Sequence, residues 1–394
     1  MNKIKLSLLT AGLLVVVQNL NAIEMTDYQV IEGTYENAYV GGQLQVNDGN
    51  QDQTSYNASG VVSYENIYTT APFVWNLQVD GIADISKGPN DGDSSQSNYD
   101  TQLNTDINKY LNNDDTTFIY GSTSMEYAKS SNASSGDDAV NIGVGAGYGR
   151  MYIATPLAKA LRIIADLREH KLITKNVSDE ALMSLAKVIH VENEYISKHG
   201  NREYKQYWYT DMEKSLQASG VLGKEGLGAF GTVRIEDVLE VQRPNERLHG
   251  WLVKGGIGQD LSNFTGLDKE TTADAMFDYA LPIGYQSQFR NTAILRKSLD
   301  AKTTTDYTFD NTLSYTYEVA NNIDWENSWL LGFTKGDNNI EDVTTNSLSS
   351  TFRYYLANNL DLTSTLRLSK TDGGINETKD WGTAFTTGIT YRLK

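Results

Sequence analysis

The 394-residue sequence predicts an all-β transmembrane barrel of about 14 antiparallel strands with an inserted α-helical domain. Three observations support this fold class. Apolar and polar residues alternate along most of the chain, the alternating runs are long, and helical spacing replaces them over residues 151–248. The runs last about 10 to 14 residues, which suits a tilted strand that crosses a bilayer better than the shorter strands of soluble proteins.

The first 22 residues read as a secretory signal peptide, with cleavage after Ala22. Lys3 and Lys5 make a basic start, and the apolar run over 6–17 is too short for a spanning helix. An ordinary N-terminal helix is the weaker alternative. We therefore expect an exported chain whose barrel begins after residue 22.

The final run shows the two-residue period most clearly. Trp381, Phe385 and Tyr391 share one face, whereas Ala384 and Arg392 share the other, as expected of a strand with one apolar face. The same pattern predicts six strands in residues 23–150, at 38–48, 57–69, 72–86, 98–110, 115–129 and 138–150. It predicts eight more in residues 249–394, at 249–262, 271–282, 286–298, 304–320, 323–335, 345–357, 360–370 and 380–394.

Connection lengths alternate along the predicted barrel. Even-numbered connections such as Ala71-Pro72 and Asn321-Asn322 are tight, whereas odd-numbered ones such as 87–97 and 336–344 are longer. Outer-membrane barrels have short periplasmic turns and long extracellular loops. The stretch at 151–248 occupies an even-numbered connection, so we predict that it is a periplasmic domain.

Helical signals recur through this stretch. Thr155 and Pro156 predict one helix start and Ser178 another, and Gly200 and Gly220 predict helix ends. Apolar residues at helical spacing then give four amphipathic helices, the last over 235–239. About 95 residues of this kind can bury a small core of their own.

The net charge of −17 lies outside the insert, in which acidic and basic residues are equal in number. Such an acidic chain is a poor partner for nucleic acid. Each predicted strand has one face with aromatic residues and one without. If the face without aromatic residues points into the lumen, more acidic than basic side chains point inward. The principal predicted lumen-lining residues are Asp80, Asp84, Asp100, Asp106, Asp306, Asp310, Glu318, Arg290, Arg296, Arg353 and Arg367. Acids and arginines on different walls would favour cations in a water-filled lumen, whereas the alternative is a closed barrel made rigid by salt bridges.

The histidines argue against an enzyme. His170, His190 and His199 lie in the insert and His249 at a predicted inner strand end, so none is available near the outer surface of the barrel wall. His190 and Glu194 have a possible metal-ligand spacing, but no second ligand pair accompanies them. We expect no enzymatic activity, no cofactor and no metal, and we expect both residues on a solvated helix face.

Two further patterns carry alternatives. Tyr207, Trp208 and Tyr209 are candidate partner-docking residues for a periplasmic protein, although such aromatic clusters are more often core with one exposed ring. Glycines at every second position over 143–149 predict a glycine-lined inner face on the sixth strand. They favour either curvature of the strand or close packing by another segment.

Together, these features resemble the Gram-negative outer-membrane β-barrel class over about three quarters of the chain. The resemblance implies insertion among outer-membrane lipids. Two functions remain open. One is a pore for small hydrophilic solutes, with an acidic lumen and a helical domain that gates it or docks a partner. The other is a non-conducting anchor or secretion and assembly scaffold whose insert binds a periplasmic protein.

Overall fold

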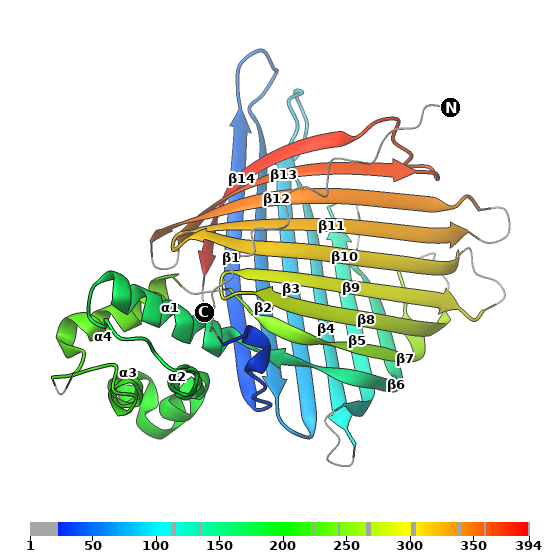
Figure 1. The fold of residues 1–394 in the computed structure, drawn as a ribbon. Helices are drawn as coiled ribbons and strands as arrows, with labels where there is room; N and C mark the ends of the chain where they lie inside the picture. Colours follow the sequence, from blue (N-terminus) through cyan, green and yellow to red (C-terminus); the bar gives the residue numbers. More distant parts are fainter. Residues whose placement is uncertain are drawn as a thin grey trace, which may run out of the picture.

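The computed structural model describes residues 23–111, 116–131, 133, 135–223, 225–242, 245–264, 269–300, 305–336, 340–357 and 360–392. Fourteen strands form a closed barrel in which each strand pairs with the next and β1 pairs with β14, antiparallel throughout (Figure 1). This confirms the predicted fold class. The predicted signal peptide lies outside the described residues.

The strands alternate in direction around the wall. Their bounds are β1 Gly33–Asn47, β2 Ser55–Thr69, β3 Phe73–Lys87, β4 Gln96–Tyr110, β5 Thr117–Ser130, β6 Asp137–Ile153, β7 Leu248–Ser262, β8 Thr271–Ile283, β9 Ser287–Ser298, β10 Thr305–Ala320, β11 Ile323–Gly336, β12 Val343–Ala357, β13 Leu360–Asp372 and β14 Gly382–Arg392.

Most predicted boundaries agree with these to within two or three residues, and the first strand differs most. It begins at Gly33 rather than 38, because residues 33–37 pair with residues 65–69 of β2. That pairing supplies backbone hydrogen bonds even though residues 33–37 lack a strong apolar alternation. Partner strands, rather than local sequence, therefore set this boundary.

The alternation separates a lipid-facing surface from the lumen. On β6, Ile142, Val144 and Tyr148 are exposed, whereas the intervening Gly143 is buried. Large apolar side chains such as Trp251 and Phe385 are likewise exposed on other strands. An outward apolar band is what a barrel in a bilayer requires.

The wall is least continuous between its first and last strands. The β1–β14 pairing runs only from Tyr39↔Arg392 to Gly42↔Ile389, whereas β1 pairs with β2 along its whole length. The outer parts of both strands extend beyond this seam. The barrel is therefore closed by one short ladder at this point.

Residues between β6 and β7 form a helical domain that lies at one end of the barrel (Figure 1). Its helices are α1 Thr155–Glu169, α2 Asp179–His190, α3 Glu192–Ala218 and α4 Gly228–Glu236, followed by a π-helical turn, η2, over Asp237–Gln242. Among the described residues, no helix is both long enough and apolar enough to cross a membrane.

The predicted helix signals hold except at the second and fourth helices, and the fourth, predicted over 235–239, is α4 over Gly228–Glu236 continued by η2. Ser178 caps α2, accepting a hydrogen bond from the Ala181 amide. The second helix ends at His190 instead of continuing to Gly200, which has φ 72° and marks a kink within α3. Apolar faces of all four helices meet in one core around Leu185, Trp208 and Met212.

The segment before β1 joins this helical core. Its single 3-10 turn, η1, spans Met25–Asp27, and the side chains of Met25 and Tyr28 are buried among the helices. Nothing in the local sequence predicts this docking, because the segment has no regular periodicity. It ties the start of the barrel to the inserted domain.

Candidate functional site

The end of the barrel that carries the short turns and the helical domain is here named the inner mouth. Two glycines in neighbouring strands bend the wall there: Gly149 of β6 has φ 104°, and Gly250 of β7 has φ 113°. A Cβ at either position would lie 2.3 Å from a backbone oxygen of the paired strand, that of Trp251 or Arg150 respectively. Only glycine adopts this conformation without strain.

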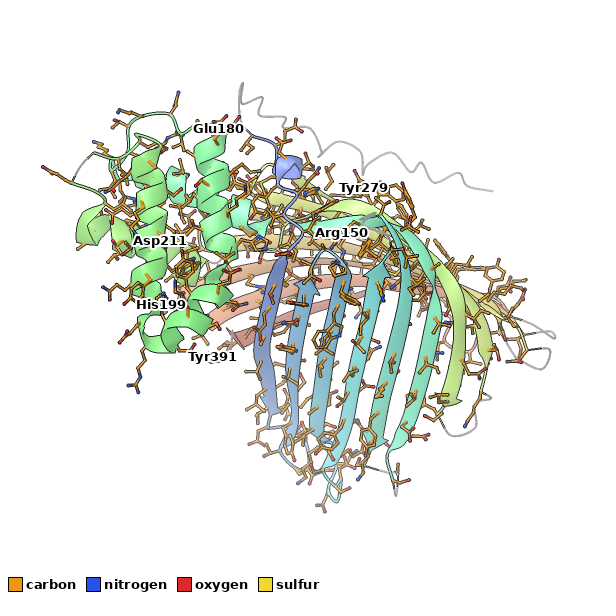
Figure 2. The ribbon with its side chains drawn as sticks, turned by 90° about the horizontal axis from the view of Figure 1, so that it is seen from below. Arg150, Glu180, His199, Asp211, Tyr279 and Tyr391 are labelled. Carbon is orange, nitrogen blue, oxygen red and sulfur yellow. The ribbon has the colours of Figure 1, made fainter. Side chains whose placement is uncertain are left out.

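Arg150 follows this bend and closes part of the inner mouth (Figure 2). Its guanidinium donates hydrogen bonds to the backbone oxygens of Thr70 and Ala71 in the β2–β3 turn, with the Ala71 contact at 3.1 Å. It also lies 4.2 Å from the centre of the Tyr110 ring. Since three strands lie between β6 and β2, this single side chain spans part of the mouth.

An apolar cluster continues the closure. Ile153, Leu248 and Ala280, from β6, β7 and β8, are buried together, and Tyr35 and Ile67 of β1 and β2 pack against them. These two groups of strands stand on different sides of the barrel. Side chains from facing walls therefore meet across the lumen, and we name this cluster together with Arg150 the inner closure.

The helical domain is bound to the inner mouth through a buried ion network. Glu318, at the inner end of β10, pairs with Arg162 of α1 and with Arg247, whose Nη2 lies 2.7 Å from a Glu318 carboxylate oxygen. All three side chains are nearly excluded from solvent. Arg247 also donates to the Tyr285 backbone oxygen in the β8–β9 turn, and Asn245 donates to Asp324 of β11.

The segment before β1 is fixed between the helical domain and the barrel. The Tyr28 hydroxyl lies 2.8 Å from His190 Nδ1 in α2, and the Tyr28 backbone oxygen lies 2.8 Å from His249 Nε2 in β7. Burial lowers the pKa of His190, and a backbone hydrogen bond with Glu32 acts against it. The prediction that His190 lies on a solvated face is therefore wrong, because the N-terminal segment covers it.

Several predicted lumen residues form ion pairs between neighbouring strands. Arg290 pairs with Asp278 at 3.0 Å and Arg296 with Asp274 at 3.1 Å, both between β9 and β8. The contacts of the others are Arg353 with Glu326, Asp306 with Lys297, Arg367 with Ser347, Asp80 with Ser63 and Gln78, and, between the non-adjacent strands β4 and β7, Asp106 with Lys254. Pairing along the wall thus replaces much of the predicted field across the lumen.

Glu318 is placed differently from the prediction. Its side chain is buried between Arg162 and Arg247 instead of lining a water-filled lumen. The strand alternation correctly gives its face, but it cannot show that the inserted domain covers this end of β10. Asp310, on the same strand, remains exposed.

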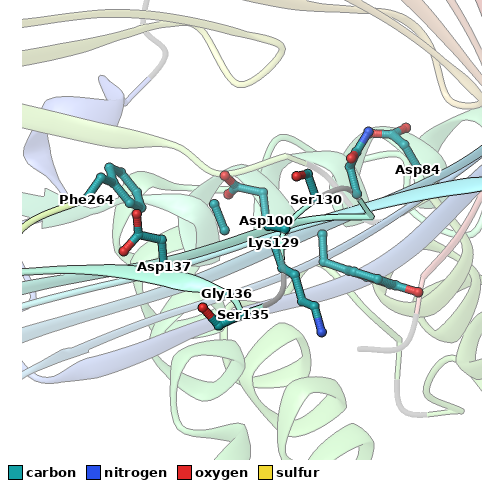
Figure 3. A pocket seen from close by; sticks show the side chains of 12 residues that line it. Asp84, Asp100, Lys129, Ser130, Ser135, Gly136, Asp137 and Phe264 are labelled. Carbon is teal, nitrogen blue, oxygen red and sulfur yellow. The ribbon is translucent and has the colours of Figure 1, made fainter. Parts of the chain in front are cut away.

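The outer end of the lumen holds an open pocket of about 730 Å³, lined by β3 to β6 and by Phe264 after β7 (Figure 3). Asp84, Asp100 and Asp137 contribute carboxylates to it. Lys129 also belongs to the pocket wall, but Figure 3 shows its amine pointing away from these carboxylates. The outer mouth therefore presents a locally acidic surface.

The predicted docking aromatics separate into core and surface. Trp208 is 1% exposed and Tyr209 is 8% exposed, so both belong to the helical core and neither offers a docking surface. Tyr207 is exposed and stacks on His199 at 3.8 Å between ring centres. The alternative of a core with one exposed ring is therefore correct.

The glycine strip on β6 permits close packing as well as curvature. A Cβ at Gly145 would meet the Tyr120 ring at 2.6 Å, and one at Gly147 would meet the Phe118 ring at 2.3 Å. Both rings come from the neighbouring strand β5. The strip thus gives aromatic side chains room inside the lumen, while Gly149 supplies the bend.

Sequence reasoning missed the residues that close the inner mouth and bind the helical domain to it. None of Arg150, Tyr28, Arg162 and Arg247 is among the predicted site residues. Their local signal is weak: Arg150 and Arg247 lie beside the predicted boundaries of the insert, whereas Tyr28 and Arg162 do not. No group of three or more His, Cys, Asp or Glu side chains within the described ranges is arranged to hold a metal ion.

No family model and no curated protein matches this sequence. Solved structures with similar folds include an outer membrane channel from Pseudomonas putida F1, at 9% identity and TM-score 0.35, over 94% of this chain and 99% of that one. CdiB from Acinetobacter baumannii has 9% identity and TM-score 0.37, over 92% and 60%. OccK5 (OpdH) from Pseudomonas aeruginosa has 6% identity and TM-score 0.30, over 92% and 98%.

These similarities concern the barrel shape alone. The closed antiparallel wall, the outward apolar band and the short inner turns define the class of the fold, which is a transmembrane β-barrel. Within that class, its distinguishing parts are the helical domain between β6 and β7 and the inner closure to which that domain is bound.

Proposed function

We propose that the barrel is a channel for small hydrophilic solutes and that the inner closure holds it shut. The observation that carries this proposal is the contrast between its two ends. Ionisable side chains line an open outer pocket, whereas the inner end is blocked by side chains of the wall and by the helical domain. A barrel wider than the small eight-stranded kind leaves luminal space that side chains alone do not fill.

Charge at the outer mouth supports a preference for cations. Asp84, Asp100 and Asp137 share the outer pocket, and the Lys129 amine points away from them. Like charges gathered at a channel entrance raise the local concentration of counter-ions. Asp306, by contrast, is paired with Lys297, so it is a less informative site for charge substitution.

The test is ion conductance and reversal potential across a planar bilayer under a salt gradient. Arg150→Ala, which removes the contacts to the β2–β3 turn, should raise the open probability. In that background, D84N/D100N should shift the reversal potential toward lower cation preference. The matched control E377Q/D380N removes the same charge from another outer loop and should leave the selectivity unchanged.

A folded protein that conducts neither as wild type nor as the Arg150→Ala variant would contradict the channel. Equal reversal potentials for the two double variants would leave conduction intact but refute the role of the outer acids. The proposed function is not enzymatic, because the described histidines serve packing contacts in the helical domain and at the inner end of β7.

A second candidate function is docking of a periplasmic protein on residues 151–248. In this case the barrel could also be a non-conducting scaffold for the docked protein. Phe230 and Val233 of α4 are each more than half exposed, and Tyr207 of α3 is also exposed. A photo-crosslinking residue at position 230 should capture one defined partner in cells. The same residue at exposed position 180, on α2, is the control, and equal labelling at both positions would count against a specific surface.

A further inference from the structure

A second cavity, of about 310 Å³, lies in the lumen directly above the inner closure. Strands β2 to β4 and β6 to β9 line it, and Ile153 and Leu248 of the inner closure form part of its wall. This volume is at the lower end of the range of small-molecule sites, about 300 to 1,000 Å³. We name this space the inner cavity.

Two of the carboxylates in the inner cavity already form ion pairs with basic side chains. Asp106 pairs with Lys254 at 3.5 Å, and Asp278 pairs with Arg290 at 3.0 Å. Glu65 of β2 lines the same cavity, and it makes no hydrogen bond or ion pair with the residues that the structure describes. Its nearest cation is Arg290, which is already paired with Asp278, so Glu65 shares that charge and can accept a further cation that enters the lumen.

Glu246, in the strand-free segment before β7, lies behind the residues that line the cavity and interacts electrostatically with Glu65. Burial raises its pKa to about 8, and the next largest cause is the nearby charge of Glu65. The other charged groups around it are Arg290 and Arg247, which lower this pKa, and Asp278, which raises it. Glu246 Oε1 is buried and has no hydrogen-bond partner within the described part of the chain.

Asn108 of β4 supplies an independent observation. Its side chain lines the inner cavity and is 2% exposed, yet its Oδ1 atom finds no hydrogen donor among the described residues. Buried polar atoms almost always have a hydrogen-bond partner, so an exception indicates that a ligand or a water molecule binds there. A hydrogen donor in the inner cavity would satisfy it.

The rest of the lining is apolar, with Met151, Leu252 and Met276 beside Ile153 and Leu248. We propose that the inner cavity binds a small aliphatic amine that carries a second hydrogen-bond donor. The ammonium group pairs with Glu65 and interacts electrostatically with Glu246, the methylene chain lies along the apolar lining, and the second donor reaches Asn108. This names a solute class for the proposed channel.

The test is isothermal titration calorimetry of the full-length, folded protein with 5-amino-1-pentanol. Pentylamine removes the second donor and 1,5-pentanediol removes the charge, so the expected order of affinity is aminopentanol, then pentylamine, then the diol. E65Q should weaken binding of both amines at least tenfold. D100N, an acid of the outer pocket, should change it less than twofold.

Two further variants assign the ends of the ligand. N108L should reduce the affinity for aminopentanol to that for pentylamine. Because a bound ammonium favours the ionised form of Glu246, affinity should rise as the pH increases from 6.5 to 9, and E246Q should remove that dependence. The amines remain protonated throughout this range.

Equal binding of the diol and the amines, or an E65Q affinity equal to that of D100N, would overturn the amine site. If E65Q does not fold, the pH dependence and its loss in E246Q decide the question. The role of the amine as a transported solute rests on the proposed channel, whereas the binding site itself does not. Binding without conduction would refute the channel and keep the site, and conduction without binding would do the reverse.

Discussion

At the scale of single residues, buried polar side chains concentrate where the helical domain meets the barrel. Tyr28, Arg247 and Glu318 are almost fully excluded from solvent, and each has a specific partner from a distant part of the chain. A buried charge or hydroxyl without such a partner would be costly. These residues therefore report a fixed contact between the domain and the barrel.

Acidification should loosen the segment before β1 through His190. Because burial lowers the pKa of this histidine below its ordinary value of 6.5, the neutral ring is favoured while Tyr28 is docked. The docked state binds fewer protons, so its stability is present above pH 6.5 and is lost as the pH falls through that value. Hydrogen exchange of residues 23–32, corrected for intrinsic rates, should accelerate severalfold between pH 7.5 and pH 5.5.

The variant His190→Gln keeps a hydrogen-bonding side chain but cannot be protonated. It should therefore abolish the faster hydrogen exchange of residues 23–32 at low pH. His199, which stacks on exposed Tyr207, provides the matched control, and His199→Gln should respond to pH as the wild type does. Retention of the full pH response in His190→Gln would show that another group controls the segment.

At the scale of elements, the ends of β6 and β7 depart from a regular barrel wall. Gly149 and Gly250 adopt positive φ in adjacent strands, and each allows a paired backbone oxygen to approach closely. The bend directs Arg150 and Ile153 into the inner closure and leads the chain into α1. Two glycines thus determine where the wall ends and the helical domain begins.

Gly149→Ala should destabilise the folded barrel by on the order of 1 to 3 kcal/mol, because alanine is strained at this φ and its Cβ would lie against the Trp251 oxygen. The urea midpoint of unfolding, followed by tryptophan fluorescence, measures this change. Gly60→Ala in β2 is the control, since a Cβ there would meet nothing nearer than 3.9 Å. Equal midpoints for the two variants would contradict the role assigned to the bend.

At the scale of the whole molecule, the helical domain is bound to the barrel by charge pairs at its base. Glu318 bridges Arg162 of α1 and Arg247 of the return segment, and the segment before β1 adds the Tyr28 contacts. The domain therefore shares its core and its ion network with the barrel end. In the proposed channel, opening of the lumen would separate some of these contacts.

Glu318→Gln should weaken this attachment by about 3 to 5 kcal/mol, because it leaves two buried guanidinium groups without their carboxylate. Thermal unfolding of the helices, followed by circular dichroism at 222 nm, should occur at a lower temperature than in the wild type. Glu326→Gln removes the partner of Arg353 at a more exposed pair and should cost less than about 1 kcal/mol. Similar losses in both variants would refute a special role for Glu318.

The barrel, its strand number and the position of the inserted domain along the chain can all be derived from the sequence. These follow from local properties: the two-residue period fixes which face meets lipid, and the helical period of 151–248 interrupts it. Luminal positions such as Asp84 and Asp100 follow from the same phase. Each inference needs only the residue and its close neighbours in the chain.

Only the tertiary structure decided how the inner end is closed. Arg150 meets the β2–β3 turn, Tyr28 meets α2, and Glu318 meets two arginines from the insert. These contacts join residues more than 70 positions apart, and no periodicity encodes them. Burial of Trp208 likewise depends on how the helices pack. Local alternation specifies which way a side chain points, but long-range packing specifies what it meets.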